Sequence, residues 1–230
     1  MFKKVVPIMQ ESHKELKVKP IDNFNFAKNI NIASIMIHEF SKVSAIYPIL
    51  FLEDKANETF KSVALLGLKE GENLFIKNGK WKASYIPAII RRYPFALSKT
   101  NESDKYVICV DEESDFISKQ EGEPLFNEDG TTGEVIEKIK AYLTELQQME
   151  SFTNDFCKTI KDLDLFTPLN INIKSKNEQR KINGAFMINE QKLNKLSDIK
   201  FLELRKKQYI PAIYAHLLSL SQIEGLVSMV

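Results

Sequence analysis

Residues 73–84, which read NLFIKNGKWKAS, carry the clearest local signal for β structure. Two short apolar segments flank the dipeptide Asn78-Gly79. This pair is the strongest short signal for a β-hairpin, because both central residues of the tight turn must tolerate a positive φ. We therefore predict two antiparallel strands, at 73–76 and 80–84, at the centre of a β-rich region.

Further apolar and β-branched segments surround this hairpin and are typical of strands. They lie at residues 49–52, 62–68 and 106–110. Residues 34–45 instead carry apolar side chains at helical spacing, which predicts a helix. The helix ends near Tyr47, because a residue before proline avoids helical geometry. A second short helix is predicted at 86–92, with Pro87 in its first turn.

Helical patterns dominate from about residue 129. Thr131 and Glu134 have the spacing of a capping box. An apolar stripe that includes Phe152 then continues to Leu163, either without interruption or after a break near Ser151. Two strands at 171–173 and 185–188, the charged loop 174–181 between them, and helices at 192–207 and 211–223 complete the chain.

The order of these elements indicates an α+β fold, because strands do not alternate regularly with long helices as in a doubly wound parallel sheet. We predict a small mixed or antiparallel sheet with short helices in residues 1–127. Residues 128–230 form a mostly helical part, packed on the same core as a single domain.

Composition excludes several classes of protein. With 32 basic and 31 acidic residues, the net charge of +1 offers no bulk attraction for nucleic acid or an anionic membrane. The longest apolar runs, at 45–52 and 209–220, are much shorter than the ~20 residues of a membrane-spanning helix. Residues 1–11 lack the apolar region of a signal peptide, so we expect a cytoplasmic protein.

Motifs for a cofactor or a metal are missing from the sequence. It contains neither a phosphate-binding glycine loop nor the nucleophile elbow or zinc-binding helix of common hydrolases, and we predict no cofactor. His38, Glu39 and distant His216 do not suit a metal ion, because adjacent helical side chains point about 100° apart. Cys109 and Cys157 lie in apolar stretches and are expected to be buried, reduced thiols.

The most unusual segment is residues 81–95, WKASYIPAIIRRYPF. It holds the only tryptophan and, in a lysine-rich chain, two of the four arginines. Planar guanidinium groups among aromatic residues indicate recognition of an anion or a carboxylate. A structural role is the alternative, in which an arginine pairs with Glu39 or Glu72 or caps the carbonyls of a short helix. The ligand-binding candidates are Trp81, Tyr85, Arg91, Arg92, Tyr93, Glu39 and His216, and no catalytic residue is assigned.

Several motifs along the chain resemble those of the SapC family of bacterial proteins. They are Glu39-Phe40, Tyr47-Pro48-Ile49, residues 64–68 (ALLGL), 71–75 (GENLF), Gly79-Lys80-Trp81, Tyr85-Ile86-Pro87-Ala88, 91–95 (RRYPF) and 214–220 (YAHLLSL). The resemblance implies an association with the bacterial surface layer but supplies no catalytic residues. A permease is excluded, because it needs several membrane-spanning helices.

Three functions remain open. The first is a non-catalytic binding or accessory role in surface-layer biogenesis, with a protein partner or a small ligand. The second is an enzyme, or an enzyme partner, with an anion pocket near Trp81, Arg91 and Arg92. The third is a structural component of the surface layer, which the near-neutral charge disfavours. The apolar end at 226–230 fits a docking strand, a tail or a secretion signal, and nothing indicates an oligomeric state.

Overall fold

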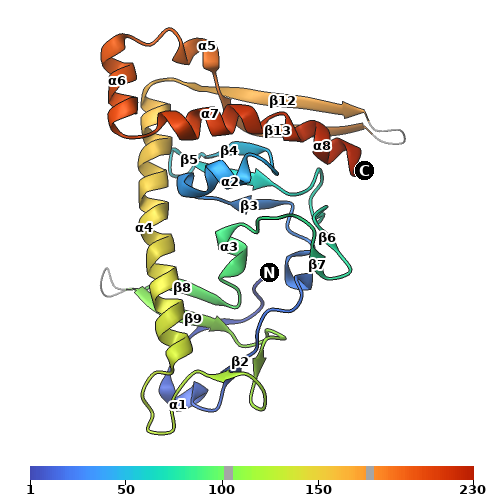
Figure 1. Cartoon of the computed structure of the whole chain (residues 1–230), viewed down its shortest axis with the longest axis vertical. Helices are drawn as coiled ribbons and strands as arrows, with labels where there is room; N and C mark the ends of the chain where they lie inside the picture. The colour runs from blue at the N-terminus through green and yellow to red at the C-terminus, as the bar shows by residue number, and fades with distance from the viewer. Residues whose placement is uncertain (101–105, 175–178) are drawn as a thin grey trace.

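The computed structural model describes residues 1–100, 106–174 and 179–230. It confirms the α+β class, with 36% of residues in helices and 25% in strands. A large antiparallel sheet lies at one end of the molecule and smaller sheets lie at the other (Figure 1). One long helix runs beside both ends.

The large sheet has five strands, and every neighbouring pair is antiparallel. The strands are β3 (Ile32–Ser34), β4 (Ile49–Asp54), β5 (Thr59–Leu65), β12 (Phe166–Lys174) and β13 (Gln179–Ile188). Their spatial order is β12-β13-β4-β5-β3, so a hairpin from the C-terminal part extends a sheet begun by the N-terminal part. The loop predicted at 174–181 lies partly outside the described residues.

The described residues also form three smaller sheets. The first contains β1 (Val5–Pro7), β9 (Tyr106–Asp111) and β8 (Phe95–Lys99). The second contains β10 (Ile117–Ser118), β2 (Lys17–Val18) and β11 (Glu123–Pro124). The third pairs β6 (Ile76–Lys77) with β7 (Lys80–Trp81). Asn78 and Gly79 have φ values of 52° and 73°, which confirms the predicted hairpin turn.

The helices are mostly short. They are α1 (Gln10–His13), the 3-10 turns η1 (Asn25–Ala27) and η2 (Ile37–Glu39), α2 (Phe40–Val43), α3 (Ala88–Arg91), α4 (Glu134–Asp162), α5 (Glu190–Leu193), α6 (Asp198–Lys206), α7 (Ile210–Ser219) and α8 (Gln222–Ser228). The helix predicted at 34–45 begins only at Ile37, because Ser34 pairs with Val63 in the sheet. The helix predicted at 192–207 is divided into α5 and α6.

Helix α4 has 29 residues and is unbroken at Ser151, so it extends for about 43 Å. The predicted capping box is wrong, because Gly133 is the N-cap and Glu134 is already the first helical residue. Thr131 instead donates its hydroxyl proton to Asp129. Among the described residues, no helix is both long and apolar enough to cross a membrane.

The buried side of α4 differs from the predicted stripe at one position. Phe152 remains 39% exposed, and Thr153 takes the buried place. The Thr153 hydroxyl donates to the Met149 carbonyl at 2.7 Å and accepts the Ile37 N–H at 3.0 Å. This polar contact keeps the buried side of the helix continuous, so no break is needed.

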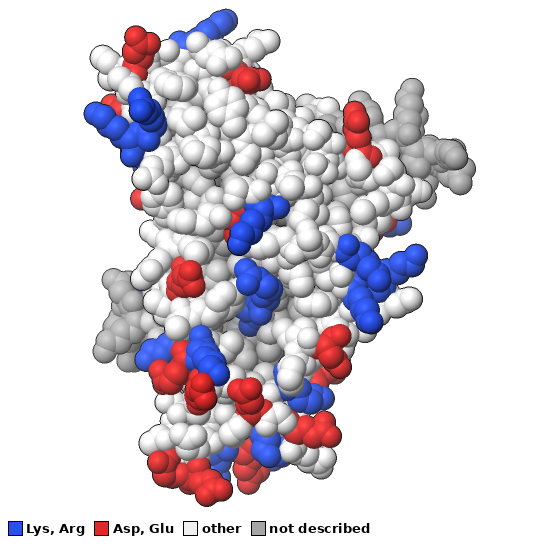
Figure 2. All heavy atoms as spheres, viewed as in Figure 1, with Lys and Arg blue, Asp and Glu red and all other residues white. Residues whose placement is uncertain are grey.

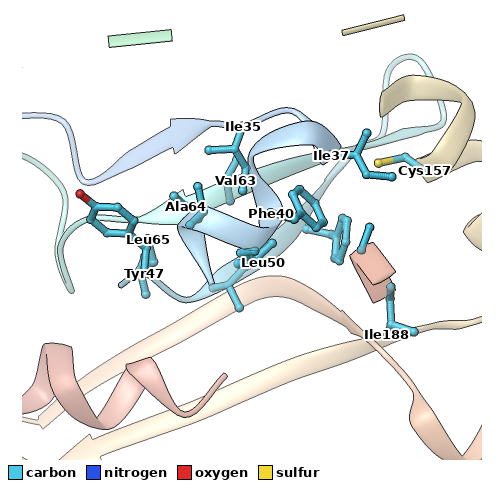
Figure 3. Close-up of a cluster of buried hydrophobic side chains, with 14 of the residues drawn as sticks. Ile35, Ile37, Phe40, Tyr47, Leu50, Val63, Ala64, Leu65, Cys157 and Ile188 are labelled. Atoms are coloured by element: carbon cyan, nitrogen blue, oxygen red, sulfur yellow. The ribbon is translucent and has the colours of Figure 1, made fainter. Parts of the chain in front are cut away.

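The main hydrophobic core lies between the large sheet, α2, α4 and α7. Figure 3 shows Phe40 and Leu50 within this cluster, with Cys157 and Ile188 on one side and Tyr47 on the other, its hydroxyl pointing outward. A second cluster, which includes Phe95, Val110 and Leu143, lies under the other half of α4. Both cysteines are buried and free, as the sequence indicates.

Candidate functional site

Glu39 is the polar centre of the predicted site. Its carboxylate is buried and accepts three hydrogen bonds. Oε2 accepts the Met36 N–H at 2.9 Å, and Oε1 accepts the Tyr85 hydroxyl at 2.7 Å and the Ala88 N–H at 2.8 Å. The same side chain therefore holds the turn before α2 and the start of α3 together.

A second group of hydrogen bonds joins this centre to the hairpin β6–β7. Trp81 donates its indole N–H to the Tyr47 hydroxyl at 2.8 Å, and that hydroxyl donates to the Tyr85 carbonyl. Burial raises the pKa values of Tyr47 and Tyr85 well above their usual range, so both phenols remain neutral hydrogen-bond donors. Trp81 also packs edge-on against Phe24, which makes it part of the framework around the site.

Arg91 lies at the surface above this network. Its Nε donates to the Ile86 carbonyl at 3.1 Å, and its guanidinium carbon lies 5.6 Å from the centre of the Tyr85 ring. The Tyr142 ring of α4 is at 5.7 Å. Arg91 thus caps a carbonyl and stacks on aromatic rings while its guanidinium remains accessible to solvent.

Lys42 lies near the same tyrosine ring and was not among the predicted residues. Its Nζ is 5.8 Å from the centre of the Tyr85 ring, so Tyr85 has cation–π contacts with both Lys42 and Arg91. Neither cation forms an ion pair within the described part of the chain. We refer to Lys42, Tyr85 and Arg91 as the cationic surface. Lys42 follows Glu39 by three positions, a spacing that places helical side chains on one face and could have signalled it.

Arg92 has different neighbours from Arg91, so the two arginines do not form one clamp. Its guanidinium carbon lies 5.6 Å from the centre of the Phe2 ring. The Nε atom is buried and has no hydrogen-bond acceptor among the described residues. Burial lowers the pKa of Arg92, and the charge of Glu150 opposes that shift.

Tyr93 belongs to another part of the molecule. Its ring stacks on Phe26 with centroids 4.2 Å apart, and its hydroxyl donates to Asp111 Oδ2 at 3.3 Å. Asp111 is fully buried and also accepts the backbone N–H groups of Lys3 and Lys4, at 3.0 and 2.8 Å. These contacts fix the N-terminal strand β1 to the end of β9.

His216 is buried far from the cationic surface in sequence and joins three elements of the main core. Its Nε2 accepts the Ile188 N–H at 3.0 Å, and Nδ1 lies 2.9 Å from the Ile49 carbonyl, to which it donates. Burial lowers its pKa to about 4, so the imidazole is neutral in the folded protein at neutral pH. Both ring nitrogens are occupied, whereas His38 is exposed and lies against Phe152.

The structure therefore brings Glu39, Tyr85 and Arg91 together and links Trp81 to them through Tyr47. It places Arg92, Tyr93 and His216 in other surroundings. Tyr47, Lys42 and Tyr142 are the neighbours that sequence reasoning missed. No local pattern marks Tyr142, because it comes from the middle of α4.

These features define an α+β protein whose buried polar side chains connect separate backbone segments beneath an exposed pair of cations. A SapC family model matches residues 8–226, and the chain belongs to that family. No curated protein and no solved structure is significantly similar to it.

Proposed function

We propose that this protein is a non-catalytic binding protein that recognises an anionic group through the cationic surface. Its cellular role would be that of an accessory factor in bacterial surface-layer biogenesis, acting in the cytoplasm. Membership of the SapC family supports the link to the surface layer, because the resemblance implies that association. The choice of ligand rests on the side chains themselves.

The observation that carries the proposal is the Tyr85 ring with Lys42 and Arg91 beside it. A guanidinium donates paired hydrogen bonds to a carboxylate, and an ammonium adds a point charge. The Arg91 Nε donates to the Ile86 carbonyl at 3.1 Å, and one outer nitrogen donates to the Tyr85 hydroxyl at 3.4 Å. These two bonds orient the exposed guanidinium, whose remaining N–H groups can donate to an incoming oxygen. Pre-orientation lowers the entropy lost when a ligand binds.

The buried polar groups favour binding over catalysis. Glu39 accepts from three donors, and both nitrogens of His216 have backbone partners. A general base must reach a proton of the substrate, and these two side chains already hold the protein's own groups. We therefore assign them to the framework and the cations to the ligand.

Binding of a small dicarboxylate tests the proposal directly. Four arginines give few Nε–Hε signals in an NMR spectrum, and Arg91→Lys identifies the signal of Arg91. Adding glutarate at constant ionic strength should move the Arg91 signal, and neutral glutaramide should not. Lys42→Gln should weaken the effect. Equal shifts at Arg91 and at exposed Arg205 would show simple charge screening and reject the proposal.

A further inference from the structure

A groove opens beside α2 and is bounded by α4 and the start of α7. Its volume is about 320 Å³, at the lower end of the ~300–1,000 Å³ typical of ligand sites. The lining residues are Ile37, His38, Phe40, Ser41, Phe152, Gln208, Pro211 and Ala212. Its walls are mainly apolar, with His38, Ser41 and Gln208 as the polar members.

The groove continues onto an apolar face of α7. Pro211 lines the groove, and Tyr214 and Leu218 follow it at spacings of three and four residues, which places them on one side of the helix. Tyr214 is 38% exposed and Leu218 is 72% exposed. Figure 2 shows a broad area without charged side chains on this face, at the level of α7 in Figure 1.

The apolar groove and the cationic surface meet on α2. His38 lines the groove, and Lys42 follows it by four positions, a spacing that places helical side chains on one face. Lys42 in turn lies beside Tyr85 and Arg91. In Figure 2, basic groups lie at the lower border of the uncharged area, and an acidic group lies against one of them.

We propose that this combined surface binds a segment of a partner protein with a large apolar side chain and a nearby carboxylate. The apolar side chain enters the groove, and the carboxylate binds Lys42 and Arg91. This inference rests on the proposed function of the cationic surface and adds the identity of the ligand class. The apolar face of α7 extends the contact beyond the size of a single small molecule.

Charge favours a protein segment over a nucleic acid. Nucleic-acid sites neutralise many phosphates, and affinity grows with the number of cations that contact them. The cationic surface offers only two cations, Lys42 and Arg91, and the whole chain has a net charge of +1. A protein segment with an acidic side chain next to an aromatic or aliphatic one matches both the two cations and the apolar groove.

Selection from a library of random short peptides, displayed against the full chain, tests this inference. We expect enrichment of peptides that pair an aromatic or large aliphatic residue with Asp or Glu. The strongest peptide is then synthesised, and its affinity is measured by fluorescence anisotropy. Ser41→Trp fills the groove without altering either cation and should weaken binding by about tenfold or more, as should the double variant Lys42→Gln/Arg91→Gln.

A second variant and a control protect the test from effects on folding. Phe152→Ser removes an exposed wall of the groove and should also weaken binding. Ser228→Trp places the same bulky residue on exposed α8, away from the groove lining, and should leave the affinity unchanged. Circular dichroism establishes that each variant is folded.

The outcomes separate this inference from the proposed function. If only the double variant loses affinity, the groove is not the binding site, although anion recognition stands. If neither the groove variants nor the double variant changes the affinity, the peptide binds elsewhere and the inference is wrong. A selection that enriches no peptide would overturn the inference, while the glutarate titration would still decide the proposed function.

Discussion

The Tyr85 hydroxyl donates a 2.7 Å hydrogen bond to Glu39 Oε1, across 46 positions of sequence. This bond fixes the phenol ring that both cations approach, because its polar end is tied to a buried carboxylate. The Ala88 N–H binds the same oxygen at 2.8 Å, so the orientation of Tyr85 and the start of α3 depend on one side chain. Recognition at the surface thus relies on a buried framework.

Replacing Glu39 with Gln should destabilise the protein. A glutamine amide keeps one oxygen acceptor, but its NH₂ group cannot accept from Met36 or from the pair of donors at Oε1. At least one buried donor is left without a partner, which costs about 1–3 kcal/mol. We expect urea denaturation to show a free energy of unfolding lowered by about 2 kcal/mol.

Tyr85→Phe provides the matched comparison for this prediction. It removes one donor and leaves the two backbone donors bound to Glu39, so the expected loss is about 1 kcal/mol. Equal stability of Glu39→Gln and the unmodified protein would show that the carboxylate does not hold these segments together.

The free energy of unfolding should decrease as the pH is lowered below about 6.5, because of His216. Burial lowers its folded-state pKa to about 4, whereas histidine in an unfolded chain has a pKa of about 6.5. Between these values the unfolded chain takes up a proton and the folded chain does not. The stability is therefore complete above about pH 6.5 and decreases towards pH 4, by about 3 kcal/mol in all.

Urea denaturation across this pH range, with His216→Gln as the reference, isolates the effect. Glutamine can donate to the Ile49 carbonyl and accept from the Ile188 N–H, but it does not titrate. The pH dependence of the variant should be flatter than that of the unmodified protein. Parallel curves would assign the acid sensitivity to other groups.

Local sequence signals predicted the elements that depend on neighbouring residues. The Asn78-Gly79 turn has the expected positive φ values, and the apolar run at 49–52 lies in β4. Such features follow from backbone sterics and burial within a few residues. The capping box failed because helix α4 begins three residues after Thr131, a boundary that spacing alone does not define.

Contacts between distant segments could not be predicted in the same way. The residues 81–95 marked the region of the site, but Tyr142 reaches it from α4, with its hydroxyl 3.0 Å from the Ala88 carbonyl. Phe152 fits the apolar stripe by spacing, yet Thr153 takes the buried place because its hydroxyl satisfies the Ile37 N–H. A buried polar contact there outweighs periodicity, and only the folded arrangement of η2 against α4 creates it.

Asp111→Asn should loosen the N-terminal strand. The buried carboxylate accepts the N–H groups of Lys3 and Lys4 on its two oxygens, and an amide can accept at only one. We expect faster trypsin cleavage after Lys3 or Lys4 and a free energy of unfolding lowered by about 2 kcal/mol. The exposed Asp115→Asn is the control and should cleave at the original rate.

The two thiols should be unreactive in the folded protein. Burial raises the pKa of Cys157 to about 12 and also raises that of Cys109, and the thiolate is the reactive form. A disulfide reagent such as DTNB should therefore label neither cysteine in native buffer and both after unfolding in guanidinium. Rapid labelling of Cys157 in native buffer would contradict its place in the main core.

Replacing Arg92 should affect only stability, whereas replacing Arg91 should affect mainly dicarboxylate binding. Arg92 is half-buried, and its Nε lacks an acceptor among the described residues, so the charge is not well compensated there. Methionine can retain the packing against Phe2 without that charge. Arg92→Met should leave the free energy of unfolding unchanged or raise it by up to about 1 kcal/mol, and glutarate should still shift the Arg91 signal.

Arg91→Gln should change the free energy of unfolding by about 0.5 kcal/mol or less and abolish dicarboxylate binding. Urea denaturation and calorimetric titration with glutarate measure the two properties, and a loss of binding in Arg92→Met would place both arginines in one site.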